Sequence, residues 1–226
     1  MLPGSSCRGP HSPASVPCVT SKYRRPFGSF LPQMKSLCVF CGSSTGSDPV
    51  FQQAAVRLAE EIIRRDMRLI YGGGNIGLMG IVADAVLAGG GEVVGVIPHA
   101  LARREVAHAN LTGLILVESM HERKARMAQL ADGFIAMPGG FGTFEEFCEV
   151  LTWNQLGIHT KPCGLLNVEG FYDSLIALFD HARDQKFLRP QHRDIVVVDS
   201  APDRLIDQML AMSPATGDKW LNESQS

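Results

Sequence analysis

The chain has 226 residues, of which 45% are hydrophobic and 19% are charged, and its formal net charge is −2. This length and balance predict an ordinary soluble globular protein with one hydrophobic core. The weak charge gives no basic field for a nucleic-acid polymer, and no apolar run approaches the roughly 18 residues that span a bilayer. Neither a nucleic-acid polymer nor a membrane is therefore expected as a partner.

Residues 1–33 differ in composition from the rest of the chain. They are rich in proline and serine, contain no acidic residue and carry several basic ones. Because they hold no compact apolar segment, they do not read as a secretory signal. We interpret them as a disordered N-terminal extension, or as sequence upstream of a working start at Met34, with a transit peptide as the alternative. The expected domain covers residues 34–212, followed by a C-terminal tail at 213–226.

From residue 35 onward, short apolar runs alternate with amphipathic stretches. The apolar runs predict strands at 37–41, 68–71, 92–97, 114–117, 134–137, 163–166 and 195–198. The stretches between them predict helices at 50–65, 76–88, 119–131, 143–157, 171–185 and 201–212. This alternation is typical of an α/β fold, and we predict a Rossmann-like doubly wound parallel sheet in a three-layer α/β/α sandwich with a single domain.

Cys38 and Cys41 form the only closely spaced pair among the six cysteines. Such spacing can bind zinc or carry redox chemistry, but both uses normally need a turn, and zinc needs further ligands. This pair lies in a predicted strand, where side chains three residues apart point to opposite faces. We therefore expect one buried cysteine and one near the strand end, no metal site, reduced thiols and a cytoplasmic protein.

A first glycine turn, Gly72-Gly73-Gly74, follows the second predicted strand and continues to Gly77 at the start of a helix. The spacing G-x-G-x-x-G has three interpretations: a dinucleotide site, a mononucleotide cradle or a tightly packed turn. Glu92, the acidic residue about twenty positions on, begins the next strand rather than ending it. This position argues against the dinucleotide site and leaves the other two open.

A second glycine turn lies between the strand at 134–137 and the following helix, and it reads Pro138-Gly-Gly-Phe-Gly-Thr-Phe-Glu-Glu146. Glycines let backbone amides approach a ligand, and a helix N-terminus adds partial positive charge, so the segment has the design of a phosphate cradle. Thr143 and Glu146 also fit a capping box, which would explain both residues without any chemistry. From the spacing alone, both interpretations stand.

An arginine interrupts the apolar face of the helix predicted at 119–131, where Met120, Arg123, Met127 and Leu130 recur at intervals of three and four. A guanidinium keeps its charge, so it must meet an anion or reach water. Arg123 is therefore either a ligand-binding residue or a side chain that extends to the helix edge. Lys124 beside it could be ordinary surface charge.

Three segments, at 120–124, 138–146 and 151–157, together resemble the LOG ("Lonely Guy") family of cytokinin riboside 5′-monophosphate phosphoribohydrolases. The resemblance extends over residues 35–212. It implies hydrolysis of the N-glycosidic bond of a purine nucleoside 5′-monophosphate, with a cytokinin nucleotide or AMP as substrate. It further implies a homodimer with shared active sites and no metal or cofactor. An older label for such proteins, lysine decarboxylase, finds no support here, because no lysine lies in a recognisable pyridoxal phosphate motif.

The resemblance also assigns residues by position. It implies a catalytic pair, Arg123 and Glu146. It implies substrate binding by Glu105, Arg123, Lys124, Gly140, Phe141, Gly142, Thr143, Phe144, Glu145, Glu146 and Thr152, with further parts of the pocket at Gly72, Gly73, Gly74 and Ser43. Residues 107–110 depart from the more acidic, glycine-containing stretch of plant members, which bears on base selectivity. A carrier or sensor that binds nucleotide without hydrolysis is the alternative, and the presence of the catalytic pair favours an enzyme.

Overall fold

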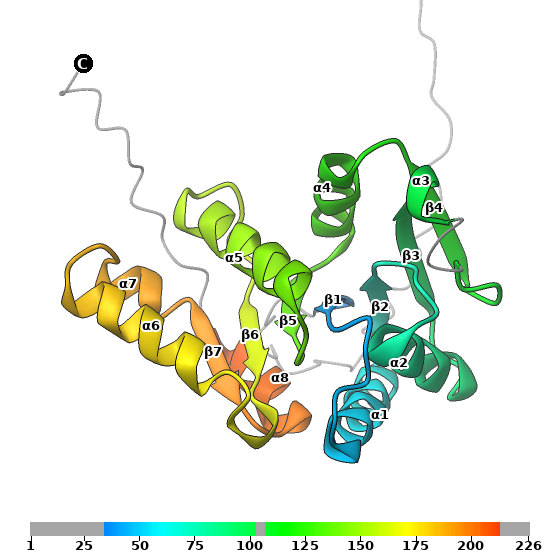
Figure 1. Ribbon diagram of the computed structural model, residues 1–226, viewed down its shortest axis with the longest axis horizontal. Helices are drawn as coiled ribbons and strands as arrows, with labels where there is room; N and C mark the ends of the chain where they lie inside the picture. The colour runs from blue at the N-terminus through cyan, green and yellow to red at the C-terminus, as the bar shows by residue number, and fades with distance from the viewer. Residues whose placement is uncertain (1–33, 103–106, 213–226) are drawn as a thin grey trace, which may run out of the picture. The chain divides into compact units, whose positions relative to one another are not determined.

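The centre of the molecule is a seven-stranded sheet in which every neighbouring pair of strands is parallel (Figure 1). The computed structural model describes residues 34–102 and 107–212, so the predicted N-terminal extension and C-terminal tail lie outside the described residues. The strand order is β4-β3-β2-β1-β5-β6-β7. The strands are β1 (Ser36–Phe40), β2 (Arg68–Tyr71), β3 (Val93–Pro98), β4 (Gly113–Val117), β5 (Gly133–Ala136), β6 (Cys163–Leu166) and β7 (Val196–Asp199).

Helices cover both faces of the sheet. One face packs on α1 (Pro49–Arg64), α2 (Gly77–Ala88) and α8 (Pro202–Ala211). The other packs on α4 (Met120–Leu130), α5 (Phe141–Gln155) and α6 (Asp173–Asp184). Short helices complete the description: α3 (His99–Ala102), the 3-10 turn η1 (Val168–Gly170) and α7 (Pro190–Arg193). The predicted three-layer, doubly wound α/β fold is confirmed, and within the described ranges no helix is long and apolar enough to cross a membrane.

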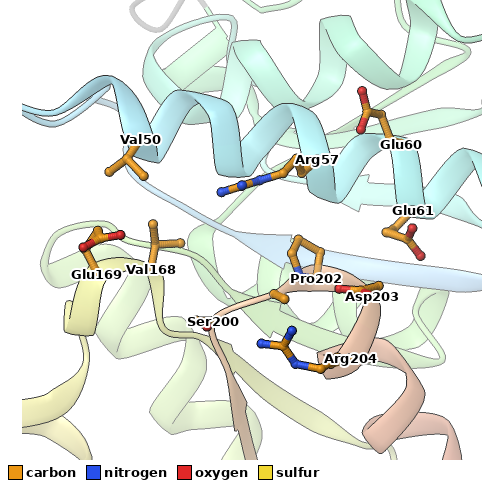
Figure 2. Close-up of a pocket in the computed structure, with 11 residues that line it drawn as sticks. Val50, Arg57, Glu60, Glu61, Val168, Glu169, Ser200, Pro202, Asp203 and Arg204 are labelled. Carbon is orange, nitrogen blue, oxygen red and sulfur yellow. The ribbon is translucent and has the colours of Figure 1, made fainter.

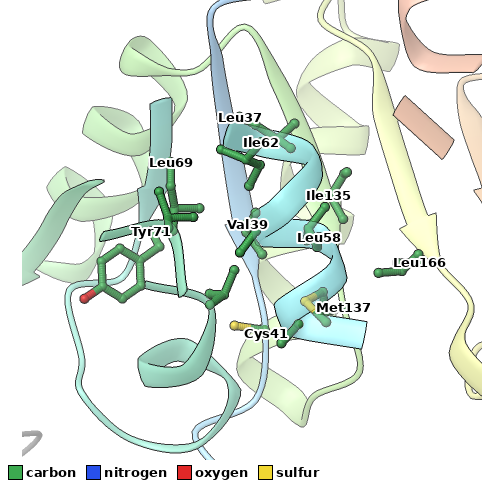
Figure 3. Close-up of a cluster of buried hydrophobic side chains, with 14 of the residues drawn as sticks. Leu37, Val39, Cys41, Leu58, Ile62, Leu69, Tyr71, Ile135, Met137 and Leu166 are labelled. Atoms are coloured by element: carbon green, nitrogen blue, oxygen red, sulfur yellow. The ribbon is translucent and has the colours of Figure 1, made fainter. Parts of the chain in front are cut away.

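Local sequence explains why the elements form where they do. Asp48 is the N-cap of helix α1, and its side chain accepts a hydrogen bond from the Val50 amide at 2.8 Å. Pro49 occupies the first helical position. Leu58 and Ile62, one turn apart on this helix, are fully buried against Leu37 and Val39 of β1 (Figure 3). Every residue of β1 is buried, as expected for a central parallel strand covered on both faces.

The two closely spaced cysteines point to opposite faces of the sheet, as their spacing predicted. Cys38 belongs to the cluster under α4 and α5, whereas Cys41, one residue beyond the end of β1, belongs to the cluster under α1 and α2. Burial raises the pKa of both thiols well above the usual range, so neither is a thiolate at neutral pH. Both cysteines therefore act as small apolar core residues.

The capping-box interpretation of Thr143 and Glu146, one of the two that the spacing left open, is wrong. The helix begins at Phe141, with Gly140 as its N-cap in an extended conformation and no side-chain capping bond. Thr143 is already inside the first turn and only 3% exposed, packed against the backbone of Gly139. The glycine turn starts the helix two residues earlier than the apolar pattern indicated. Glu146 consequently lies in the second turn, where it cannot cap the helix.

Candidate active site

A cavity of about 300 Å³ opens at the carboxyl ends of β1 and β5. Strands β2, β3 and β4 follow β1 toward one edge of the sheet, and β6 and β7 follow β5 toward the other edge. The boundary between β1 and β5 is therefore the topological switch point of the sheet. Ligands of open α/β sheets bind in the crevice at such a point. The cavity is lined by residues 42–46, by residues 138–140, and by Phe51, Leu78 and Phe171.

Backbone contacts hold the loops of this cavity together. The Gly42 amide donates to the Pro138 carbonyl at 3.0 Å, and the Leu78 amide donates to the Gly42 carbonyl at 3.0 Å. Gly77 has a φ of +59°, and any side chain there would overlap the backbone of Ser43. Ser43 is exposed on a loop that is thus fixed between the two glycine turns.

The N-terminus of α5 has the properties of an anion site. Amides in the first turn of a helix have no intrahelical acceptor, and no side chain caps this helix. A Cβ atom added at Gly140 or at Gly142 would meet nothing within 4 Å. Packing therefore does not require glycine at either position, whereas a ligand that approaches the backbone closely would. The dipole of this 15-residue helix adds to the attraction for phosphate.

Arg123 on α4 is only 7% exposed and does not extend to the surface. Its Nε donates to the Val96 carbonyl at 3.1 Å, and its Nη2 donates to the Gly72 carbonyl at 3.2 Å. A Cβ atom at residue 72 would overlap Nη2, so the guanidinium requires the first glycine of the turn. Within the described ranges no carboxylate lies within ion-pair distance of it. A guanidinium keeps its charge, and a site of this kind suits an anionic ligand.

Glu146 lies on α5 between the core-facing side and the side that faces α4. Thr143, Phe147 and Val150 form the buried stripe of the helix, and Glu146 follows Thr143 by one turn at the rim of this stripe. Burial is the largest cause of the raised pKa of Cys38, and the negative charge of Glu146 raises this pKa further. The positive charge of Arg123 lowers the same pKa. Helices α4 and α5, which carry Arg123 and Glu146, pack through Met127, Phe147 and Val150 on the same face of the sheet.

Lys124 links α4 to α5 rather than standing as isolated surface charge. Its Nζ contacts Glu145 Oε1 at 2.6 Å and Glu149 Oε1 at 3.1 Å, and its side chain is only 10% exposed. Burial lowers the pKa of Lys124, but the hydrogen bonds to the two carboxylates outweigh this effect and raise the pKa overall. Sequence reasoning missed Glu149, which its position one turn after Glu145 could have indicated.

The structure does not bring every predicted site residue to the cavity. Thr152 is exposed on the outer side of α5, and its hydroxyl donates to the Cys148 carbonyl at 2.8 Å. Phe141 is 91% exposed, and Phe144 packs its ring against Phe171 and Tyr172. Glu105 lies outside the described residues.

The first glycine turn is not a dinucleotide fingerprint. Glu92, which would contact a ribose in that motif, precedes β3 at the opposite edge of the sheet and pairs with Arg68 at 2.7 Å. Gly73 has a φ of +78°, which favours glycine, and it packs against β3. Tight packing is therefore one role of Gly72 and Gly73, while contact of Gly72, Gly73 and Gly74 with a mononucleotide stays a prediction.

A second cavity, of about 560 Å³, lies between α1 and the start of α8 (Figure 2). Its lining is strongly charged, but several of these charges are paired within the protein. Glu61 pairs with Arg64 and Arg65, and Arg204 pairs with Asp199 at 2.6 Å. It contains no glycine turn, whereas the smaller cavity is lined by the second glycine turn at Pro138, Gly139 and Gly140. The smaller cavity is therefore the better candidate for binding a nucleotide phosphate.

A doubly wound sheet with two glycine turns, an uncapped helix N-terminus and a buried arginine that binds one of these turns defines a nucleotide-phosphate-binding α/β protein. Residues 79–209 match the family model described as "Possible lysine decarboxylase". The chain is 52% identical over 171 residues to cytokinin riboside 5′-monophosphate phosphoribohydrolase LOG2 of Arabidopsis thaliana, covering 76% of this chain and 79% of the relative. It is 50% identical over 184 residues to LOG7 of the same plant, covering 80% and 84%. The chain belongs to this phosphoribohydrolase family.

Solved structures share the fold at lower identity. The molybdenum cofactor carrier protein of Chlamydomonas reinhardtii aligns with a TM-score of 0.60 and 17% identity, covering 79% of this chain and 99% of that one. The molybdenum cofactor binding protein of Rippkaea orientalis gives a TM-score of 0.59 and 21% identity, covering 77% and 94%. At these identities the likeness supports the Rossmann-like architecture alone.

Proposed function

We propose that this protein hydrolyses the N-glycosidic bond of a purine nucleoside 5′-monophosphate and releases the free base and ribose 5-phosphate. The observation that carries the proposal is the buried Arg123 guanidinium, which two backbone carbonyls fix on α4, a helix that covers the same sheet face as the helix of Glu146. The names of relatives at about 50% identity support the same reaction. Cytokinin nucleotides and AMP are the substrates that we propose.

The 5′-phosphate binds at the N-terminus of α5. The amides of the first turn, together with the open space at Gly140 and Gly142, accept an anion without loss of a protein hydrogen bond. Ser43 lies on the neighbouring loop of the same cavity and adds a hydroxyl donor. The ribose then extends toward Arg123 and Glu146. Glu105, which lies outside the described residues, is proposed to contact the nucleotide on the basis of the family resemblance alone.

Cleavage of the bond between C1′ and the purine nitrogen leaves positive charge on the ribose ring. The Glu146 carboxylate stabilises this oxocarbenium-like state and orients the attacking water. The bonding electrons go to the purine nitrogen, the water oxygen bonds to C1′, and the proton that the water loses ends on the base. Arg123 holds the sugar phosphate in place, because the carbonyls of Val96 and Gly72 already fix the position of its guanidinium.

The test is to incubate the purified protein with AMP and, separately, with an isoprenylated AMP, and to follow the free base by chromatography. We expect release from at least one nucleotide, and the ratio of the two kcat/KM values identifies the preferred base. Nucleotide binding without release from either substrate would indicate the carrier or sensor instead.

We also propose a cytoplasmic homodimer whose active sites use residues of both subunits. Phe141 and Thr152 fall on one outward stripe of α5, and Leu156, the C-cap residue, continues this stripe. The side chains of Phe141 and Leu156 are 91% and 55% exposed. Exposed apolar residues of this size support a protein interface. Because Thr152 lies away from the cavity of its own chain, a partner subunit is the simplest way for it to reach a substrate.

A further inference from the structure

Residues 107–110, here called the crossing segment, lie across the first glycine turn. Ala107 forms an isolated antiparallel bridge with Gly74, and the His108 amide donates to the Gly73 carbonyl at 3.1 Å. These contacts lie directly beside the Gly72 carbonyl that binds Arg123. Two hydrogen bonds thus hold the turn: the Arg123 guanidinium donates to the Gly72 carbonyl, and the His108 amide donates to the Gly73 carbonyl.

The imidazole of His108 is fixed on both of its nitrogens. The residue is 5% exposed, its Nδ1 accepts a hydrogen bond from the Asn110 amide at 3.2 Å, and its Nε2 lies 2.8 Å from Asp84 Oδ1. Since Nδ1 accepts, Nε2 carries the hydrogen and donates to the carboxylate. Asp84 belongs to α2, the helix that begins directly after the glycine turn. The imidazole therefore ties the crossing segment to the helix on the other end of the turn.

Among the described residues, no other side-chain hydrogen bond joins residues 107–110 to α2. Tyr71 immediately precedes the turn, but its buried hydroxyl makes no hydrogen bond among the described residues, and Figure 3 shows it directed away from the aliphatic cluster. Gly73 itself is pressed against β3, where a side chain at residue 95 would overlap its Cα. A shift of Gly73 is therefore passed to Gly72 and to the guanidinium that Gly72 binds.

We propose that His108, held by Asp84, is a positioning residue that fixes the Gly72–Gly74 turn and through it the Arg123 guanidinium. The inference rests on the proposed phosphoribohydrolase function. A misplacement of about 1 Å in a reacting group can cost roughly a hundredfold in rate. A hydrogen-bonded imidazole remote from the substrate is thus sufficient to influence turnover.

The first experiment compares kcat and KM of His108→Ala, His108→Gln and Asp84→Ala on the preferred nucleotide. We expect kcat to fall roughly tenfold or more in His108→Ala and in Asp84→Ala, with partial rescue in His108→Gln, whose amide can still donate to Asp84. His99→Ala, at an exposed histidine of α3, is the matched control and should retain the wild-type kcat. Because the Asp84 side chain is 67% exposed, its variant tests the idea even if His108→Ala folds poorly.

The second experiment asks whether His108 acts through Arg123. In an Arg123→Lys background, His108→Ala should lower kcat by less than about twofold, because the guanidinium that His108 positions is absent from this variant. An equal loss in both backgrounds, or an unchanged kcat in His108→Ala and Asp84→Ala, overturns the proposal. If the wild-type protein releases no base, the hydrolase function fails instead. A crystal structure of His108→Ala then decides the positioning role, and an unmoved guanidinium overturns it.

Discussion

At the scale of single residues, Glu146 is the sharpest test of the proposed chemistry. Glu146→Gln keeps the size of the side chain and removes the charge that stabilises the ribose cation. We expect normal folding and AMP binding with kcat reduced roughly a hundredfold or more. Steady-state kinetics beside isothermal titration separates the two effects. Glu60→Gln, on the exposed side of α1, is the control, and a fully active Glu146→Gln protein would rule out the mechanism.

A substitution at Gly142 tests ligand binding separately from folding. Alanine at this helical position has open space and a favourable propensity, so Gly142→Ala should leave stability unchanged or raise it by about 0.5 kcal/mol. The added methyl group nevertheless lies beside the amides that bind phosphate, and KM should rise roughly tenfold. Gly113→Ala, at the start of β4 where the methyl group makes only ordinary contact, serves as the control. A stable Gly142→Ala protein with an unchanged KM would contradict the phosphate site.

Sequence could identify unusual site residues but not their partners. Arg123 was recognisable because a permanent charge interrupts an apolar stripe. Its acceptors, Gly72 and Val96, lie 51 and 27 residues away and follow only from the sheet. The capping-box interpretation was wrong for a related reason. Thr143 and Glu146 have the residue types and spacing of a capping box, but the helix already begins at Phe141, after Gly140. Local spacing cannot decide between two helix starts that lie two residues apart.

At the scale of elements, the junction of α5 with β6 makes stability depend on pH. The half-buried His159 ring lies 5.2 Å from the Phe134 ring, and its Nδ1 accepts from the Lys161 amide at 3.1 Å. Burial, followed by the Lys161 charge, lowers the pKa of His159 from 6.5 to about 4. Between these values the unfolded chain binds a proton that the folded chain does not. Folding stability is therefore full above about pH 6.5 and falls as the pH decreases toward 4.

The expected loss between pH 7 and pH 5 is on the order of 1 kcal/mol, once solvent screening of a partly exposed ring is allowed for. Urea denaturation at the two pH values measures it, and His159→Gln should flatten this part of the dependence. His181→Gln, at an exposed histidine of α6, should not. An equal decline in wild type and His159→Gln would assign the effect to other groups.

The elements themselves were predictable because each carries its own apolar period. The strands at 68–71 and 163–166 have the predicted bounds, and the helices differ by only one or two residues at most ends. The order of the strands was not predictable in the same way. It depends on which strands pair across the sheet, and the central place of β1 beside β5, which creates the cavity, is a property of the folded chain.

At the scale of the whole molecule, the outward stripe of α5 predicts a dimer. Leu156→Glu places a charge at one end of the proposed interface and should convert a dimer into a monomer, because a buried unpaired carboxylate is costly. Light scattering coupled to size-exclusion chromatography measures the mass directly. Leu178→Glu, at an exposed leucine of α6, is the control. A wild-type protein that elutes as a monomer at micromolar concentration would contradict the dimer.

Shared active sites make a stronger prediction than the dimer itself. If each site takes Arg123 from one subunit and Thr152 from its partner, a mixed dimer of Arg123→Ala and Thr152→Val chains contains one site with both changes and one unchanged site. Random exchange of the two inactive variants should therefore restore roughly one quarter of the wild-type activity. If each site lies within one subunit, every site in the mixture carries one change and no activity returns. The mixture thus decides whether the outward position of Thr152 on α5 serves catalysis in the neighbouring chain.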